Sequence, residues 1–428
     1  MPQMKVRLAV VVCFAFLLLS GVALAGGSYL SGRSVVVPDA GNNRVLIYYH
    51  PRFNNQAADV VLGQTGPNTA TSGTSATTMS APSQYAVDNW GNLYVSDTGN
   101  CRVLQFAPPF TDGEAATVVI GQPDANTSCG AVASASTLGK TGGLGFDQSG
   151  NLWVADAGNN RVLRFKAPFT TGETADVVIG QPDFATSDCL APPTAAALCG
   201  PIGVAFDANN DLWVADSRNN RVLEYKSPKK NPNANVELGQ PAGPNAFSSD
   251  TPNTGGVSAS SLYEPTGIAF DWDNRLWVAD TENSRVLRFK ASYQNGNPAN
   301  LVLGQANFTS YLMNQNLGTP TAATLSFPQG IVIDDPDGNV WVGDTLNNRT
   351  LEFVAPFGGN GAEALVVLGQ ADFVSSQENQ SNAEPSGTTQ GLPFYNAGPS
   401  LIALAVLACL VSGRHWLLRL RRASQGVS

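Results

Sequence analysis

One segment of this chain occurs six times, and its recurrence constrains the fold more than any other feature. In residues 151–165 it reads "NLWVADAGNNRVLRF", which is an alternating apolar segment, a polar turn and a second apolar segment. Every copy has an aspartate at the end of the first apolar segment and an arginine five positions later. These pairs are Asp39 and Arg44, Asp97 and Arg102, Asp156 and Arg161, Asp216 and Arg221, Asp280 and Arg285, and Asp344 and Arg349. Successive aspartates are separated by 58, 59, 60, 64 and 64 residues.

Two further elements recur in the same register. A "VVLGQ"-type segment follows each copy and ends at Gln64, Gln122, Gln181, Gln240, Gln305 or Gln370. A "PxGxAFD"-type segment precedes the later copies, at 82–88, 141–147, 201–207, 265–271 and 328–334, but not the first. Short, β-rich segments between Gly- and Asp-containing turns are typical of strands, so each unit is predicted to have four strands, a to d.

Repeated four-stranded units are the signature of propeller blades, which bury both faces against their neighbours. The sequence therefore predicts an all-β, six-bladed β-propeller within residues 26–398. Its repeats are expected at about 34–66, 82–124, 141–183, 201–242, 265–307 and 328–372. The d–a and b–c loops share one face of such a propeller, here called the top face.

The repeat resembles the NHL family, whose six-bladed propellers carry a "P-x-G-[IV]-A-[FV]-D…G-N-[LI]-[WY]-V-[AS]-D-[ST]-x-N-x-R-[VI]" pattern. Residues 201–225 match this pattern almost throughout, and the resemblance covers about 34–372. The first unit departs from the family because it lacks strand a.

The missing strand is expected from the other end of the chain, because propellers usually close by completing one blade from both termini. The distance from each Gln to the next strand a is 18, 19, 20, 25 or 23 residues, and 23 residues beyond Gln370 lies Pro393. Residues 392–397 are therefore predicted to form strand a of the first blade. The chain would leave this strand at the bottom face, so the top face would point away from a membrane anchor that follows.

The two ends of the sequence differ from the middle. Residues 1–25 have a basic start, an apolar run and "ALA" before Gly26, which predicts a secretory signal peptide. Residues 399–420 are apolar and lead into arginines, which predicts a transmembrane helix with 421–428 as its cytoplasmic tail. A cleavable sorting tail and a buried core helix are the alternatives for this segment. Each of these three interpretations of residues 399–420 places the propeller outside the cytosol, with the protein at the cell membrane or envelope.

Charge argues against nucleic acid as a partner. The net charge of the whole chain is −9, from 24 Lys and Arg against 33 Asp and Glu. Six of the basic residues lie in the two ends, so the middle of the chain has 18 basic and 33 acidic residues and a net charge of −15. Such a domain repels phosphate backbones. The RNA-binding role of some NHL propellers needs a basic top face, so the resemblance does not extend to that role.

The Asp and Arg of the repeat are predicted to be structural. They flank a tight b–c turn, and Asn and Gly in that turn tolerate positive φ. A guanidinium can bond a carboxylate or carbonyls bidentately and so tie neighbouring blades together. Six copies suit a ring-shaped scaffold better than an active site. The tryptophans of strand b are likewise predicted to form core between blades.

Six cysteines occur, of which four lie outside the two apolar ends. Cys189 and Cys199 bracket one d–a loop, while Cys101 in a b–c turn and Cys129 in the next d–a loop share the top face. We expect the disulfides Cys101–Cys129 and Cys189–Cys199, although four cysteines permit three pairings. Zinc is disfavoured because neither CxxC spacing nor partner histidines are present.

Function is expected where the repeat is broken, on top-face loops of unequal length. The prediction is a non-enzymatic, membrane-anchored binding or scaffold propeller, monomeric, with a protein, peptide or glycan ligand and no cofactor. Loop aromatics proposed as ligand anchors, or alternatively as pins for their own loops, are Phe184, Phe247, Tyr263, Phe308 and Tyr311.

The alternative is a Ca²⁺-dependent lactonase or lyase, because six-bladed relatives of that kind hold a metal in the central channel. The two histidines, His50 and His415, exclude a multi-histidine site, and no catalytic residues are predicted. Ca²⁺ held by carboxylates and amides is not excluded, and the acid-rich hairpin 334–339 is one place where it could bind weakly.

Overall fold

The computed structural model describes residues 34–230, 232–243, 246–333 and 338–378. The predicted signal peptide, the predicted closing strand at 392–397 and the apolar tail at 399–420 lie outside these residues. Within the described part of the chain, no helix is long and apolar enough to cross a membrane.

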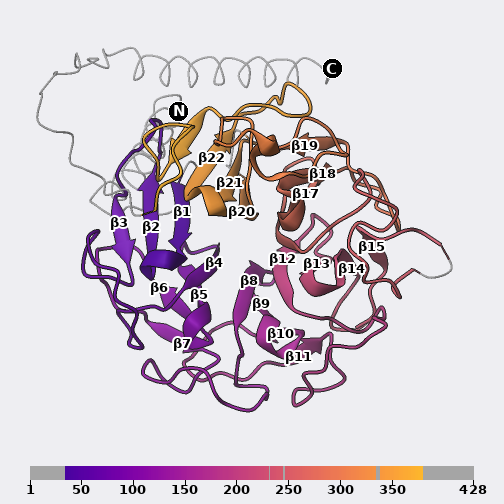
Figure 1. Ribbon diagram of the computed structural model, residues 1–428. Helices are drawn as coiled ribbons and strands as arrows, with labels where there is room; N and C mark the ends of the chain where they lie inside the picture. The colour runs from indigo at the N-terminus through magenta and orange to yellow at the C-terminus, as the bar shows by residue number, and fades with distance from the viewer. Residues whose placement is uncertain (1–33, 231, 244–245, 334–337, 379–428) are drawn as a thin grey trace, which may run out of the picture. The chain divides into compact units, whose positions relative to one another are not determined.

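Six antiparallel sheets follow one another around a ring, five with four strands and one with three. In each four-stranded blade, consecutive strands are hydrogen-bonded neighbours, so a blade is a simple meander. Figure 1 shows strand a of each such blade near the axis and strand d at the rim. The predicted all-β, six-bladed propeller is confirmed.

Equivalent strands of the six blades have nearly equal lengths. Strand a is β4 (Pro82–Val87), β8 (Thr141–Phe146), β12 (Pro201–Phe206), β16 (Pro265–Phe270) and β20 (Pro328–Ile333). Strand b is β1 (Ser34–Asp39), β5 (Leu93–Asp97), β9 (Leu152–Asp156), β13 (Leu212–Asp216), β17 (Leu276–Asp280) and β21 (Val340–Asp344). Strand c is β2 (Arg44–Tyr49), β6 (Arg102–Phe106), β10 (Arg161–Phe165), β14 (Arg221–Tyr225), β18 (Arg285–Phe289) and β22 (Arg349–Phe353). Strand d is β3 (Val60–Leu62), β7 (Val118–Ile120), β11 (Val177–Ile179), β15 (Val236–Leu238), β19 (Leu301–Leu303) and β23 (Val366–Leu368).

Short 3₁₀ turns join strand b to strand c in every blade. They are η1 (Ala40–Asn42), η2 (Thr98–Asn100), η3 (Ala157–Asn159), η4 (Ser217–Asn219), η5 (Thr281–Asn283) and η7 (Thr345–Asn347). One further 3₁₀ segment, η6 (Met313–Asn316), lies in the loop between blades 5 and 6.

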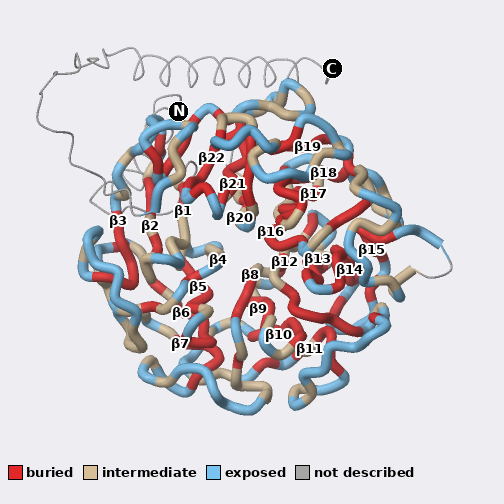
Figure 2. The backbone as a smooth tube through the Cα atoms, in the orientation of Figure 1, coloured by how far each residue is buried: buried red, intermediate tan, exposed pale blue. Residues whose placement is uncertain are grey.

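The core lies between the blades, because each sheet is covered on both faces. All five residues of β9, β13 and β17 are buried, whereas exposed residues gather in the loops (Figure 2). Each hydrophobic cluster takes its members from two adjacent blades. The aromatic residue of strand b crosses to the next blade: Trp153 contacts Phe206 edge-on with ring centroids 5.8 Å apart, and Trp213 contacts Phe270 at 5.7 Å. The predicted inter-blade role of these tryptophans is confirmed.

Counted over the described residues, the seam between blade 6 and blade 1 has the smallest hydrophobic cluster of the six. Its cluster has five buried members, whereas the other clusters have ten to thirteen. Val367 of β23 also exchanges two hydrogen bonds with the β2–β3 loop, accepting from the Asn55 N–H at 3.0 Å and donating to Asn54 Oδ1 at 3.1 Å. In the described residues blade 1 has three strands, and its Asp39 side chain is 23% exposed, although the equivalent aspartates are fully buried. A strand on the inner edge of β1 would cover this side chain.

Deleting residues 388–398 is expected to lower the melting temperature sharply, because the inner edge of β1 would then have no partner strand. The control is a chain that ends at residue 398, which removes the apolar tail and keeps the predicted closing strand. Equal melting temperatures for the two proteins, measured by differential scanning fluorimetry, would exclude this closure.

Candidate functional site

The six Asp–Arg turns lie on the top face and share one geometry. In blade 3, Asp156 ends β9, η3 makes the turn, and Asn160 adopts the left-handed conformation with φ 53° before Arg161 begins β10. Asparagine suits this position because its short polar side chain tolerates positive φ. The turn therefore places the aspartate and the arginine opposite each other at the ends of paired strands.

The arginine binds its aspartate and three backbone carbonyls. In all six blades Nε donates to Oδ2 of the aspartate at 2.6–2.8 Å. In blade 3, Nη2 of Arg161 also donates to the carbonyls of Ser134 and Thr137, both at 2.9 Å, and Nη1 donates to the Phe184 carbonyl. Ser134 and Thr137 belong to the loop that enters the blade, and Phe184 belongs to the loop that leaves it. One guanidinium thus joins two successive top-face loops.

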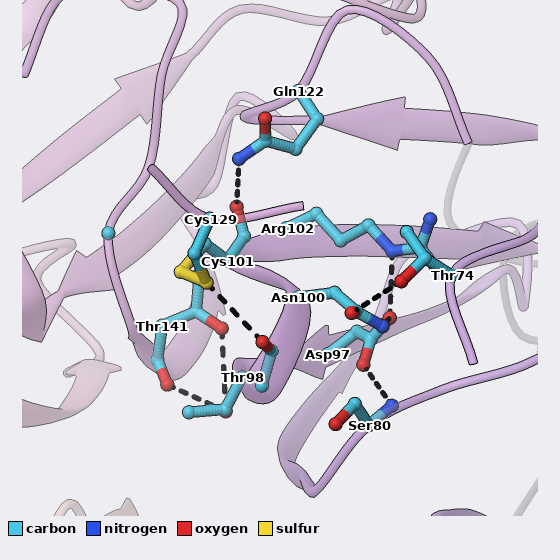
Figure 3. Close-up of a disulfide and its surroundings, with 12 residues drawn as sticks. Thr74, Ser80, Asp97, Thr98, Asn100, Cys101, Arg102, Gln122, Cys129 and Thr141 are labelled. Atoms are coloured by element: carbon cyan, nitrogen blue, oxygen red, sulfur yellow. Dashed lines mark hydrogen bonds and ion pairs between the residues drawn. A yellow bond between two sulfur atoms is a disulfide. The ribbon is translucent and has the colours of Figure 1, made fainter. Parts of the chain in front are cut away.

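The aspartate is bonded from the other side. Figure 3 shows the arrangement in blade 2, where Asp97 accepts from the Ser80 N–H at 2.7 Å, from Nδ2 of Asn100 at 2.8 Å and from Nε of Arg102 at 2.7 Å. Burial raises the pKa of Asp97, and each of these donors opposes that shift. Protein donors surround the carboxylate, which is what the predicted structural role of the pair requires.

Asparagine and glutamine side chains of the repeat hold the same loops. In blade 3, Nδ2 of Asn160 donates to the Ser187 carbonyl and its Oδ1 accepts from the Gly200 N–H, both at 2.8 Å. Nε2 of Gln181 donates to the Asn160 carbonyl at 2.9 Å. The polar residues that made the repeat visible in the sequence are therefore used within the scaffold.

Both expected cysteine pairs are disulfide-bonded in the structure. Cys101 takes the left-handed position that Asn160 has in blade 3, and it is joined to Cys129 with Cα atoms 5.0 Å apart (Figure 3). Here a covalent bond replaces the hydrogen bond from an asparagine to the following loop. Cys189 and Cys199 close a second top-face loop, with Cα atoms 4.9 Å apart. Two disulfides fit an oxidising, extracytoplasmic compartment.

The five loop aromatics fall into different environments. Phe184, Phe247 and Phe308 are partly buried against inter-blade clusters, and their carbonyls accept from the arginines of blades 3, 4 and 5. The N–H of Tyr263 donates to Asp280 at 2.7 Å. Tyr311 is 49% exposed. A ligand contact for any of them stays a prediction, and Tyr311 offers the most open side chain.

Tyr311 has apolar neighbours that the sequence-based expectation missed. Leu312, Met313 and Leu317 from the same loop, and Leu346 from η7 of blade 6, are 48–58% exposed. These five residues are called the blade 6 apolar patch. Their signal in the sequence was the run "SYLMNQNL" in a loop otherwise rich in Thr, Ala and Asn.

The patch is held in shape by amide hydrogen bonds. Nδ2 of Asn314 donates to Oδ1 of Asn347 at 3.1 Å, and Nδ2 of Asn347 donates to Oδ1 of Asn314 at 2.8 Å. This bond pair joins loop 306–327 to η7, the two elements that carry the residues of the patch. Asn314, Gln315 and Asn316 all have positive φ, so a non-helical loop path presents these apolar side chains to solvent.

A hollow lies beside the Trp277 ring. A hollow of about 420 Å³ is lined by Arg275, Arg288 and residues 355–357, and Arg288 stacks over the Trp277 ring at 5.3 Å. The hairpin 334–339, considered for Ca²⁺, lies partly outside the described residues.

The fold defines the chain as a six-bladed β-propeller. It carries NHL repeats, because the NHL repeat family model matches residues 198–225 and 262–289. Comparison with curated proteins gives no match.

Three solved structures that resemble this chain are described by their identity, coverage and TM-score. A virginiamycin B lyase from Staphylococcus aureus with quinupristin is 11% identical over 77% of this chain and 85% of that chain, with a TM-score of 0.39. A nidogen/laminin complex is 13% identical over 68% and 86%, with a TM-score of 0.40. A protein of unknown function from Bacteroides caccae is 10% identical over 79% and 98%, with a TM-score of 0.45. At these values nothing about ligands or activity transfers to this chain.

Replacing Arg161 by alanine is expected to destabilise the protein by about 3–5 kcal/mol, because Asp156 would remain buried without its partner charge. Arg164→Ala in the same blade is the control, because its partner Asp176 is 37% exposed and stays solvated without it, so the expected loss is smaller. Urea unfolding followed by tryptophan fluorescence measures both. Equal losses would contradict the role assigned to burial.

Removing the first disulfide as Cys101→Ser with Cys129→Ser is expected to cost about 3–4 kcal/mol, because the bond closes a loop with a sequence separation of 28. Cys101→Asn with Cys129→Ser supplies the asparagine found in blade 3 and is expected to recover about 1 kcal/mol. The comparison uses the unfolding midpoints of the two double variants. An asparagine variant no more stable than the serine variant would contradict the equivalence of the two bonds.

Proposed function

We propose that this propeller is a non-enzymatic binding module, and that the blade 6 apolar patch binds a protein or peptide that presents apolar side chains. The observation that carries the proposal is the half-exposure of five large apolar residues on a loop framework fixed by paired amides. Contiguous exposed apolar surface of this kind marks interaction sites in soluble proteins.

The chemistry around the patch supports an uncharged, apolar partner. Loop 306–327, which supplies four of the five residues, contains no Asp, Glu, Lys or Arg, although the chain as a whole is acidic. Interface cores are depleted of charge and enriched in Tyr and Met, as this patch is. The Asp, Arg, Asn and Gln side chains of the repeat are hydrogen-bonded to one another and to the top-face loops. The apolar patch is therefore the feature by which blade 6 differs from the repeat.

The compartment is part of the same proposal. Residues 1–25 would direct export, 399–420 would anchor the chain in the membrane, and 421–428 would remain in the cytoplasm. The two disulfides support an oxidising location for the propeller. A top face turned away from the membrane would present the patch to partners outside the cell.

Peptides selected from a random phage-displayed library on the immobilised protein are expected to be rich in apolar residues. Their affinity should fall at least tenfold for Met313→Ser with Leu346→Ser, because these side chains supply the buried contact. The melting temperature should not change, since both residues are already half in water. Fluorescence anisotropy of labelled selected peptides gives the affinities.

Val132→Ser is the control, because Val132 is 84% exposed on a different top-face loop and its loss should leave peptide affinity unchanged. Peptides that bind the patch variant and the wild type equally would refute the assignment of the site.

A further inference from the structure

In the a–b hairpin of blade 4 the residue before strand b is an aspartate, whereas blades 2, 3 and 6 have an asparagine there and blade 5 has an arginine. Asp207 follows β12, Asp211 precedes β13, and Glu224 lies on the adjacent β14. One carboxylate oxygen from each of the three residues lies within 4.8 Å of the other two. Three acids thus converge on the bottom face, away from the blade 6 apolar patch.

In the neighbouring blades a donor takes the place of Asp211. Asn92 donates Nδ2 to Asp88 at 2.7 Å in blade 2, and Asn151 donates to Asp147 at 2.9 Å in blade 3. In blade 5 the donor is a guanidinium, since Nε of Arg275 lies 2.8 Å from its aspartate. The side chain of an ionised Asp211 has no proton to donate. The donors to Asp207 are instead the N–H groups of Asn209 and Asp211, both at 2.9 Å, and Nδ2 of Asn209 at 3.4 Å.

The side chain of Glu224 also differs from the residues at the same strand c position in the other blades. The equivalent residues are Gln105, Arg164, Arg288 and Glu352, and the glutamate in blade 6 accepts a hydrogen bond from Asn339 at 2.9 Å. Glu224 is only 4% exposed. Among the described residues its Oε2 has no hydrogen-bond partner, although that oxygen belongs to a carboxylate directed at two other acids.

A second buried atom is left without a partner beside this cluster. The indole Nε1 of Trp153 donates to Asp147 at 3.0 Å, and that of Trp277 donates to Asp271 at 2.8 Å. The fully buried Trp213 is their equivalent, but its Nε1 has no hydrogen-bond partner in the described part of the chain. The carboxylate of Asp207 therefore lacks the indole bond that Asp147 and Asp271 accept. Among the residues that the structure describes, its Oδ2 is held only by a 3.4 Å bond from Nδ2 of Asn209, which leaves that oxygen open to a further partner.

The surrounding protein offers little positive charge. Nζ of Lys226 lies 3.5 Å from Oε2 of Glu224, but this lysine side chain is 57% exposed and carries one charge against three. Three carboxylates within 4.8 Å of one another, with only this exposed ammonium beside them among the described residues, repel each other, and a bound cation would relieve that repulsion.

We propose that Asp207, Asp211 and Glu224 bind one Ca²⁺ ion. Calcium takes carboxylate oxygens at about 2.3–2.6 Å, so two oxygens on one ion lie at most about 5 Å apart, which the observed separation satisfies. The ion compensates the like charges, binds Asp207 where the indole donor is missing and ties strand c of the blade to its a–b hairpin. Exposed sides of the site leave room for water to complete the coordination, since Asp211 is only partly buried.

Isothermal titration of Ca²⁺ into the purified full-length protein, freed of metal with EDTA, tests the site. One equivalent is expected to bind with a Kd of about 10⁻⁴–10⁻³ M, the range of extracellular modules. Asp211→Asn with Glu224→Gln gives blade 4 the residues of blade 2, and it should lose this binding while folding normally. Without calcium the variant should melt at a higher temperature than the wild type, because it lacks the carboxylate repulsion.

Asp124→Asn with Asp183→Asn is the matched control, because it removes two exposed carboxylates and changes the net charge equally. It should bind Ca²⁺ as the wild type does. Terbium, a luminescent substitute for calcium, should be sensitised by the adjacent Trp213 in the wild type and not in Asp211→Asn alone. No heat of calcium binding in the wild type at millimolar concentration, or equal binding by the blade 4 variant, would overturn the proposal.

Discussion

The buried bond between an aspartate at the end of strand b and an arginine at the start of strand c is the interaction on which the rest of this propeller depends. A planar guanidinium offers five donors in a fixed plane, which is enough to bind one carboxylate and several carbonyls at once. In blade 3 it holds the loops on both sides of Arg161. Irregular loops on the top face therefore have defined paths, although they contain little regular structure of their own.

This interaction works together with the packing between blades. A single four-stranded sheet cannot bury both of its faces, so each blade depends on the aromatic residues of its neighbours. Trp153, Trp213 and Trp277 each reach into the next blade and make the ring continuous. Blade 1 departs from the pattern: among the described residues β1, β2 and the β2–β3 loop contact blade 6 through a small cluster and two hydrogen bonds to Val367.

The disulfide, the acid cluster and the apolar patch each involve a residue at which one copy of the repeat differs from the others. Cys101 replaces an asparagine and forms a disulfide in its place. Asp211 replaces an amide donor and leaves three acids together, while Leu346 places an apolar side chain in a turn that elsewhere is polar or small. Five other copies show what each position does for the fold, so a departure identifies a residue that is available for something else. The proposed binding surface and the proposed cation site each include such a residue, Leu346 and Asp211.

The sequence by itself determined the architecture, since the spacing of Asp156, Arg161 and their equivalents defines six blades and the cysteine positions suggest the observed pairing. Local periodicity and turn chemistry suffice for this, because each blade is built from neighbours in the chain. Only the tertiary structure decided which side chains are exposed and which acids converge. Phe184 and Tyr311 are both loop aromatics in the sequence, yet one packs against a cluster and the other faces solvent. Asp211 and Glu224 are thirteen positions apart, and they meet because antiparallel pairing of β13 with β14 brings the start of one strand beside the end of the other.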